Sequence, residues 1–136
     1  MRLDVKAAGL PGALLLTPAL HRDDRGWFIE SWNDRDFYEV TGLNIRFVQD
    51  NHSCSARNVL RGLHYQIPDA QGKLVRVTSG VIFDVIVDLR RSSPGFGRWV
   101  SRTDSCLLKT MRRSCTKPRT TGTRRRSARC FGTIPT

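Results

Sequence analysis

Residues 81–89 read Val81-Ile82-Phe83-Asp84-Val85-Ile86-Val87-Asp88-Leu89, and this stretch has the clearest strand pattern in the chain. Successive side chains of a strand face opposite ways, so its odd-numbered residues form one continuous apolar face. The even-numbered face is mixed, because it carries the carboxylates of Asp84 and Asp88 among isoleucines. Carboxylates on such a face indicate an interior with a function, and a salt bridge from Asp88 to Arg90 or Arg91 at the rim is the plainer alternative.

Further strand patterns precede this stretch and are separated by turn signals. We expect strands at residues 13–17, 27–32, 45–51, 59–66 and 73–78, a polar turn at 21–26 and one short helix at 34–40. Asp34 is the expected cap of the helix, and Gly42 is its expected end. Short strands at near-regular spacing with one brief helix are typical of a sandwich or barrel. The predicted fold class is therefore all-β.

Charge divides the chain close to Arg98. Residues 1–98 carry 13 Lys and Arg against 11 Asp and Glu, whereas residues 99–136 carry 10 against Asp104 alone. The total of 136 residues predicts about one domain. No apolar run approaches the ~20 residues of a membrane-spanning helix. The apolar segment 10–20 contains two prolines and predicts a strand, not a signal peptide, so we expect a cytoplasmic protein without a membrane partner.

A guanidinium and an imidazole lie close together in the segment Val59-Leu60-Arg61-Gly62-Leu63-His64-Tyr65-Gln66. In a regular strand Arg61 and His64 would face opposite sides, because they are three positions apart. Glycine inside a strand often marks a bulge, and a bulge at Gly62 would let both side chains serve one pocket. A buried structural histidine with a surface arginine is the alternative interpretation.

The strand pattern at 27–32 places a carboxylate between aromatic rings. Phe28, Glu30 and Trp32 share one face by the period of two. This arrangement suits a pocket wall that stacks a flat ligand and accepts a hydrogen bond from it. An edge strand with Glu30 in water is the alternative.

Metal chemistry has little support in the sequence. The chain has no glycine-rich phosphate loop and no Cys/His cluster with zinc spacing, and His21, His52 and His64 are scattered. Residues 1–98 also lack the His-x-His pair followed by Glu that is the usual metal signature of cupins. We therefore expect no metal.

Five segments of the first 98 residues form a recognisable set. They are residues 24–30, 47–53, 59–66, 71–76 and 83–90, followed by Ser93-Pro94 and Phe96-Gly97. In this order and at this spacing they resemble the dTDP-4-dehydrorhamnose 3,5-epimerases, and the resemblance covers residues 3–98. It implies a cupin-type jelly-roll barrel of antiparallel strands that acts as a homodimer without metal or organic cofactor. The implied substrate is a dTDP-linked 4-keto-6-deoxy sugar.

The resemblance also implies roles for individual residues. It makes His64 the general base, places Arg61 and Lys73 near the sugar, and assigns Arg25, Glu30, Gln49 and Asn51 to the nucleotide or the diphosphate. Histidine suits the removal of a carbon-bound proton at neutral pH. Lysine can stabilise the resulting enolate, and arginine pairs with a diphosphate in a fork. Asp84 is a candidate to orient His64, from its place on the mixed face alone.

The proton donor that the resemblance implies is a tyrosine downstream of residue 98, and this chain has no tyrosine after Tyr65. The segment 99–136 has no sustained strand or helix period, and we interpret it as the poorly ordered product of a shifted reading frame. Codons chosen for 99–122 can encode, one frame over, a downstream family segment with its histidine and tyrosines. A basic arm that binds nucleic acid is the less favoured alternative.

The sequence therefore predicts residues 1–98 as the N-terminal portion of a cupin domain and 99–136 as an irregular basic tail outside the family. Such a half barrel is expected to fold poorly or to depend on a partner. The implied function is conversion of dTDP-4-dehydro-6-deoxy-D-glucose to dTDP-4-dehydro-L-rhamnose. The alternatives are an inactive remnant that binds sugar nucleotide weakly or not at all, and a related cupin 3-epimerase or ketoisomerase.

Overall fold

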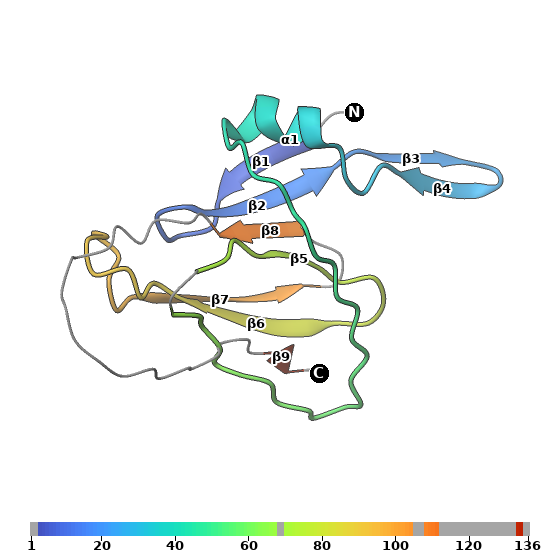
Figure 1. Cartoon of the computed structure of the whole chain (residues 1–136). Helices are drawn as coiled ribbons and strands as arrows, with labels where there is room; N and C mark the ends of the chain where they lie inside the picture. Colours follow the sequence, from blue (N-terminus) through green and yellow to red (C-terminus); the bar gives the residue numbers. More distant parts are fainter. Residues whose placement is uncertain (1–2, 68–69, 105–107, 112–132, 135–136) are drawn as a thin grey trace.

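The computed structural model describes residues 3–67, 70–104, 108–111 and 133–134. Within these residues the chain consists of short strands and one helix, which confirms the predicted all-β class (Figure 1). The strand pairs among these residues are all antiparallel. Across the part of the chain described, the sheets stay open and do not close into a barrel.

The strands form two sheets and a separate hairpin. The first sheet has the order β1-β2-β8-β5, with β1 at Leu3–Ala7, β2 at Ala13–Pro18, β8 at Leu108–Met111 and β5 at Leu74–Arg76. The second has the order β7-β6-β9, with β7 at Trp99–Asp104, β6 at Ile82–Val87 and β9 at Thr133–Ile134. The hairpin pairs β3, Leu20–Asp23, with β4, Gly26–Ile29, and projects away from both sheets (Figure 1).

Helix α1, Asp34–Thr41, follows the hairpin. Its cap is Asn33 and not the predicted Asp34, because Asn33 keeps an extended backbone and its side-chain oxygen accepts from the Asp36 amide at 3.1 Å. The predicted end at Gly42 is confirmed. Gly42 is left-handed, with φ of 66°, and its amide donates to the Tyr38 carbonyl at 2.8 Å.

The helix covers the first sheet through Phe37. This ring is fully buried and lies in one cluster with Leu16 of β2 and with Leu43. The Trp32 ring lies 5.0 Å from the Phe37 ring and 5.2 Å from the Phe47 ring, between centroids. Phe37 thus joins the helix, the sheet and the segment that follows the helix.

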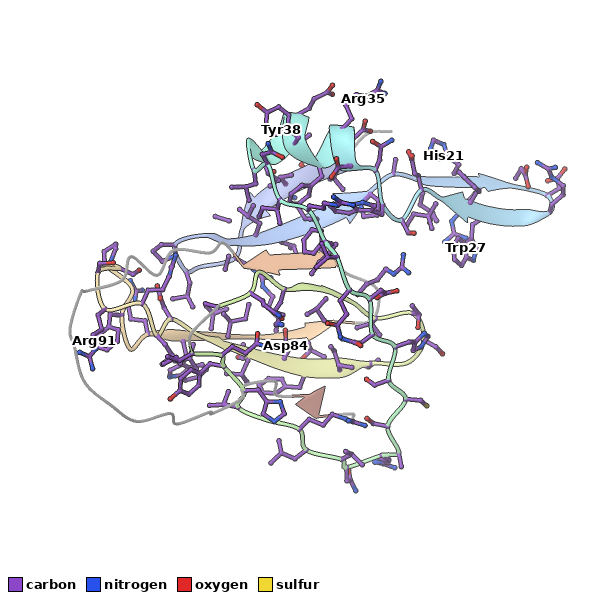
Figure 2. The ribbon with its side chains drawn as sticks, in the orientation of Figure 1. His21, Trp27, Arg35, Tyr38, Asp84 and Arg91 are labelled. Atoms are coloured by element: carbon purple, nitrogen blue, oxygen red, sulfur yellow. The ribbon has the colours of Figure 1, made fainter. Side chains whose placement is uncertain are left out.

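Replacing Phe37 by alanine is expected to lower the free energy of unfolding by about 3–5 kcal/mol, because a large cavity opens among packed rings. Tyr38 is the matched control, since it is 55% exposed and points outward from the same helix (Figure 2). Its alanine variant is expected to stay within about 0.5 kcal/mol of the unaltered chain. Urea unfolding followed by circular dichroism measures both, and equal losses would contradict the assigned core.

Two predicted strands are wrong. Residues 45–51 and 59–66 are extended but form no strand, and within them the structure has only a single bridge residue, Arg61. A strand needs a neighbouring strand for its amides and carbonyls. Their composition is that of strands, yet neither segment belongs to a sheet of the described residues. The predicted bulge at Gly62 therefore does not exist as a sheet feature.

The predicted turn at 21–26 is partly wrong, since Leu20–Asp23 is strand β3 and the turn is confined to Asp24 and Arg25. The matching strand β4 ends at Ile29 and does not reach Trp32. The two strands of such a ribbon form because they pair with each other. The polar composition of β3 gave no sign of this pairing.

The structure shows which of the two faces of residues 81–89 is buried. The strand itself is confirmed as β6, Ile82–Val87. Its most buried neighbourhood lies on the mixed face, where Ile86 and Asp88 are both buried, whereas Leu89 of the apolar face is 46% exposed. Ile86 packs with Ala8, Leu10 and Ala13 from the β1–β2 region. The second sheet therefore turns its mixed face to this core.

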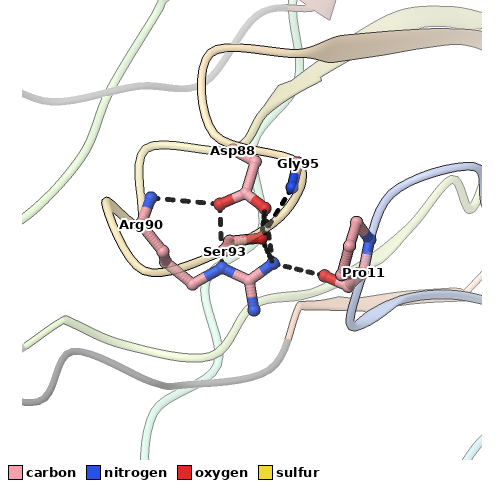
Figure 3. A network of polar contacts seen from close by, with 5 residues as sticks. All are labelled: Pro11, Asp88, Arg90, Ser93 and Gly95. Carbon is pink, nitrogen blue, oxygen red and sulfur yellow. Dashed lines mark hydrogen bonds and ion pairs between the residues drawn. The ribbon is translucent and has the colours of Figure 1, made fainter.

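The alternative of a salt bridge from Asp88 to Arg90 or Arg91 is present with Arg90, but it is buried and not at the rim. It connects the loop after β6 to the turn between β1 and β2 (Figure 3). Arg90 Nη2 lies 2.6 Å from Asp88 Oδ2 and also donates to the Pro11 carbonyl. Ser93 donates its hydroxyl to the same carboxylate oxygen. A methyl group on Gly95 would lie 2.9 Å from Pro11 Cδ and 3.0 Å from Asp88 Oδ2, so the loop has no room for a side chain there.

We expected no regular element beyond residue 98, and the described residues there are strands β7, β8 and β9. Strand β7 pairs with β6 along its whole length, from Val87 opposite Trp99 to Ile82 opposite Asp104. This pairing gives the backbone amides and carbonyls of β6 their hydrogen-bond partners. Backbone pairing of this kind does not depend on the side-chain pattern of β7. The other residues of the tail lie outside the described part of the chain.

Candidate active site

The segment around His64 carries two of the predicted site residues, His64 and Arg61. His64 is half-buried, and Arg61 precedes it by three positions. Arg61 donates from Nε to the Ser55 hydroxyl at 3.0 Å, which folds the 52–58 loop back onto this segment. Ser55 was not predicted, because its contact with Arg61 depends on the path of the loop.

Lys73 is joined to the same segment by its ammonium group. Its Nζ donates to Gln66 Oε1 at 3.3 Å and to Gln71 Oε1 at 2.5 Å. Partial burial lowers the pKa of Lys73 below the ordinary value of 10.5, because a charged ammonium is less stable away from water. The Gln66 contact places the Lys73 ammonium two residues along the chain from His64. Gln66 and Gln71 were not predicted, although both lie inside the quoted motifs.

Asp84 lies on β6 and is half-buried. Figure 2 shows it near the middle of the molecule, far from the hairpin that carries His21 and Trp27. Its backbone pairs with Arg102 on one side and with Thr133 on the other. Its role in orienting His64 stays a prediction.

Gln49 and Asn51 lie side by side, as their spacing of two predicts. Gln49 Nε2 donates to Asn51 Oδ1 at 3.1 Å, and both residues are exposed. The pair presents amide donors and acceptors to solvent on the same extended segment that leads to Ser55.

Arg25 lies apart from these groups, at the tip of the β3–β4 hairpin. Its guanidinium and backbone amide both bond to Asp23, and the side-chain bond holds the pKa of Asp23 below its ordinary value. An open hollow of about 500 Å³ lies on the hairpin and is lined by His21, Arg22, Asp23, Arg25, Trp27 and Phe28. Within one chain, Arg25 is therefore not brought to Lys73.

The predicted pocket wall of Phe28, Glu30 and Trp32 does not form. Phe28 is 68% exposed on the hairpin, whereas Trp32 packs against Phe37. Glu30 accepts from Asn33 Nδ2 at 2.8 Å at the start of the helix. The strand ends between Phe28 and Trp32, so the shared face predicted by the period of two is lost.

Within the described residues, no three His, Cys, Asp or Glu side chains gather as a metal ion would require. In the same part of the chain, no helix has the length and apolar character of a membrane span.

The family model described as dTDP-4-dehydrorhamnose 3,5-epimerase matches residues 7–111 of this chain. The chain belongs to the dTDP-4-dehydrorhamnose 3,5-epimerase family. The resemblance drawn from the motifs is thereby confirmed. The matched range runs past residue 98, and the boundary placed there stays a prediction.

Individual relatives agree with this assignment. The dTDP-4-dehydrorhamnose 3,5-epimerase of Pseudomonas aeruginosa is 63% identical over 91 residues, which are 67% of this chain and 50% of that protein. The epimerase RmlC of Legionella pneumophila, solved with dTDP-4-keto-L-rhamnose, superposes with a TM-score of 0.80 at 34% identity over 98% of this chain and 65% of its own. The epimerase of Bacillus anthracis, solved with TDP and PPi, superposes with a TM-score of 0.78 at 37% identity. The match covers 98% of this chain and 72% of that one.

The solved relatives are epimerases of the cupin fold, so the predicted cupin-type architecture with an incomplete barrel is confirmed. This chain spans only about half the length of the Pseudomonas relative. The family epimerase has further sequence for which this chain has no match.

Proposed function

We propose that this chain serves the dTDP-4-dehydrorhamnose 3,5-epimerase reaction, in which dTDP-4-dehydro-6-deoxy-D-glucose becomes dTDP-4-dehydro-L-rhamnose. The observation that carries the proposal is the contact between Lys73 and Gln66. It ties a partly desolvated ammonium to the segment that holds His64 and Arg61. A base and two cations on adjoining stretches are what proton abstraction next to a ketone requires.

In the proposed reaction, His64 removes the proton from the carbon next to the C4 ketone. The electrons of the broken C–H bond move onto the ketone oxygen and form an enolate. Lys73 is the group that stabilises this oxygen, and a desolvated cation does so more strongly than a hydrated one. Arg61, held by Ser55, binds beside the sugar. Asp84 is proposed to orient His64.

The nucleotide and its diphosphate are assigned to Arg25, Glu30, Gln49 and Asn51. The Legionella and Bacillus relatives were solved with dTDP-4-keto-L-rhamnose and with TDP and PPi, which supports a dTDP-sugar as the ligand. Arg25 lies on a projecting hairpin whose Leu20, Trp27 and Phe28 are exposed. A homodimer in which this hairpin packs on the partner explains both facts, and we propose that assembly.

Inversion also needs an acid on the opposite face of the sugar. The tyrosines of the given sequence are Tyr38 and Tyr65, and residues 66–136 contain none. This observation favours a second candidate, an inactive remnant that binds the sugar nucleotide. The proposed cause is a frame shift within 99–136, and the nucleotide sequence of the gene decides that point.

Deuterium exchange separates the candidates. The purified chain is incubated in D₂O with dTDP-4-dehydro-6-deoxy-D-glucose, and deuterium at C3 and C5 is followed by NMR. Exchange at both carbons with inversion supports the epimerase, and exchange at one carbon indicates a related 3-epimerase. Exchange with retained configuration indicates that the base acts without a proton donor on the opposite face of the sugar. Binding without exchange indicates the remnant, and neither binding nor exchange refutes the proposed function.

Replacing Lys73 by methionine is expected to weaken binding of dTDP-4-dehydro-6-deoxy-D-glucose by about 10–100-fold, because a hydrogen bond from a charged group to the ketone oxygen contributes about 1.5–3 kcal/mol. Methionine keeps most of the length of the side chain and removes the charge. Lys6→Met is the matched control, since Lys6 is 70% exposed on β1 and pairs only loosely with Asp4 at 3.3 Å. Isothermal titration calorimetry measures both, and equal affinities would contradict the role of Lys73.

A further inference from the structure

The turn that precedes Arg61 brings together two side chains that are six positions apart in the sequence. The Val59 amide donates to the Ala56 carbonyl at 3.4 Å, and Asn58 has a left-handed backbone with φ of 67°. Asparagine adopts this conformation more readily than most residues other than glycine. Because the chain reverses here, Arg61 Nε can donate to the Ser55 hydroxyl at 3.0 Å, and the bond closes a small loop.

The bond matters because Arg61 has little packing to hold its side chain. Arg61 is exposed, whereas Ser55 is half-buried. A long exposed side chain populates many rotamers, and a ligand that orders it has to overcome the lost entropy. The Ser55 hydroxyl lowers this cost, since it fixes one edge of the guanidinium before a ligand arrives. Arg61 is also a bridge residue, so its backbone is held as well.

The bond also decides which edge of the guanidinium a ligand can meet. Arginine forms a fork either with Nε and one Nη or with its two terminal nitrogens. The donation to Ser55 takes up the Nε–H of Arg61. Among the described residues, the terminal nitrogens of Arg61 have no hydrogen bond or ion pair. The edge that remains for a ligand is therefore the one formed by these two nitrogens.

We propose that Ser55 is a positioning residue of the sugar-nucleotide site, which holds Arg61 so that its two terminal nitrogens face the ligand. Two oxygens of the dTDP-linked keto sugar accept from this edge. Ser55 acts through Arg61 and does not touch the ligand itself. The ligand in this inference rests on the proposed function, whereas the bond between Ser55 and Arg61 can be tested without any ligand.

The first experiment follows the Arg61 Nε–H by ¹⁵N NMR in the full chain without ligand. The Arg61→Lys variant identifies the signal, because it lacks that signal. We expect the Nε–H to exchange with water at least about threefold faster in Ser55→Ala, since the acceptor is lost. Ser55→Thr keeps a hydroxyl and should keep the slow exchange. Ser92→Ala is the matched control, because Ser92 is exposed on the loop after β6, and it should leave the rate unchanged.

The second experiment measures the affinity for dTDP-4-dehydro-6-deoxy-D-glucose by calorimetry. Ser55→Ala is expected to weaken binding about three- to tenfold, because the ligand then has to order the guanidinium itself. Ser55→Thr should restore the affinity. In the Arg61→Lys background, Ser55→Ala should change the affinity less than about twofold, since lysine has no guanidinium edge to orient.

Three results would overturn the proposal. They are an exchange rate that Ser55→Ala leaves unchanged, faster exchange that Ser55→Thr shows to the same extent, and an equal loss of affinity with arginine and with lysine at position 61. The last result would mean that Ser55 supports the site without acting through Arg61. If the unaltered chain does not bind the sugar nucleotide, the proposed function fails and the role toward the ligand fails with it. The exchange rates would still show whether Ser55 holds Arg61, so the two failures are distinguishable.

Discussion

Replacing Asp88 by alanine is expected to lower the free energy of unfolding by about 3–5 kcal/mol, because it removes one partner of the buried Asp88–Arg90 ion pair. The side chain of Asp88 is 2% exposed and that of Arg90 is 23% exposed. Removal of the carboxylate would take away the acceptor that the Arg90 guanidinium and the Ser93 hydroxyl share, and would leave Arg90 with its contact to the Pro11 carbonyl. The expected loss lies toward the lower end of the range, because water reaches part of the guanidinium.

The position of this pair in the chain explains the size of the effect. The Asp88 backbone also holds the loop, because its amide donates to the Arg98 carbonyl at 2.9 Å and its carbonyl accepts from Gly97 at 2.8 Å. Arg90 in turn donates to the Pro11 carbonyl, 79 positions earlier in the sequence. The carboxylate thus connects the second sheet with the turn of the first.

Asp4→Ala is the control for this substitution. Asp4 is 58% exposed, and its contact with Lys6 is a surface pair of the kind that contributes little. Its loss is expected to be below about 0.5 kcal/mol in urea unfolding. Similar losses for Asp88→Ala and Asp4→Ala would refute a stabilising role for the buried pair.

The same pair makes the free energy of unfolding depend on pH in the acid range. The hydrogen bond from Arg90 holds the pKa of Asp88 well below its ordinary value of 3.8. A group with a depressed pKa contributes stability above its unfolded value and loses it as the pH falls toward the folded value. The stability of the unaltered chain should therefore fall as the pH drops below about 4, and the Asp88→Asn variant should show a flatter profile there.

Local signals predicted those elements whose partners are close in the sequence. Strand β2 has a clear apolar run closed by Pro18, and the end of α1 needs only the left-handed conformation that Gly42 adopts. The Asp88–Arg90 pair was also visible, since its members are two positions apart. The burial of the pair could not be predicted, because it depends on the contact of Arg90 with Pro11, which lies 79 positions earlier in the sequence.

The failures concern features that depend on distant neighbours. Residues 45–51 and 59–66 have strand composition, but composition does not provide a strand to pair with. Arg61, His64 and Lys73 were assigned by their motifs, and the structure ties Lys73 to the segment of His64 through Gln66. Arg25 shares the same motif evidence, yet it lies on a separate hairpin. Motifs identify residue types, while the path of the chain decides which of them meet.

Replacing His64 by asparagine is expected to reduce deuterium uptake at C3 and C5 of dTDP-4-dehydro-6-deoxy-D-glucose by about 10²–10⁴-fold. Asparagine is close to histidine in size and cannot accept the proton at neutral pH. Affinity for dTDP is expected to change less than about threefold, because the phosphates are assigned to other residues. NMR in D₂O gives the exchange rates, and calorimetry gives the affinity.

His52→Asn is the matched control, since His52 is exposed on the neighbouring loop and has no assigned role. Its exchange rate should equal that of the unaltered chain. A base acting without an acid on the opposite face returns deuterium to the side from which it took the proton, so the exchanged sugar should keep its configuration. Uptake that survives in His64→Asn but falls in His52→Asn would move the base to His52, and inversion by the unaltered chain would require a proton donor other than a downstream tyrosine.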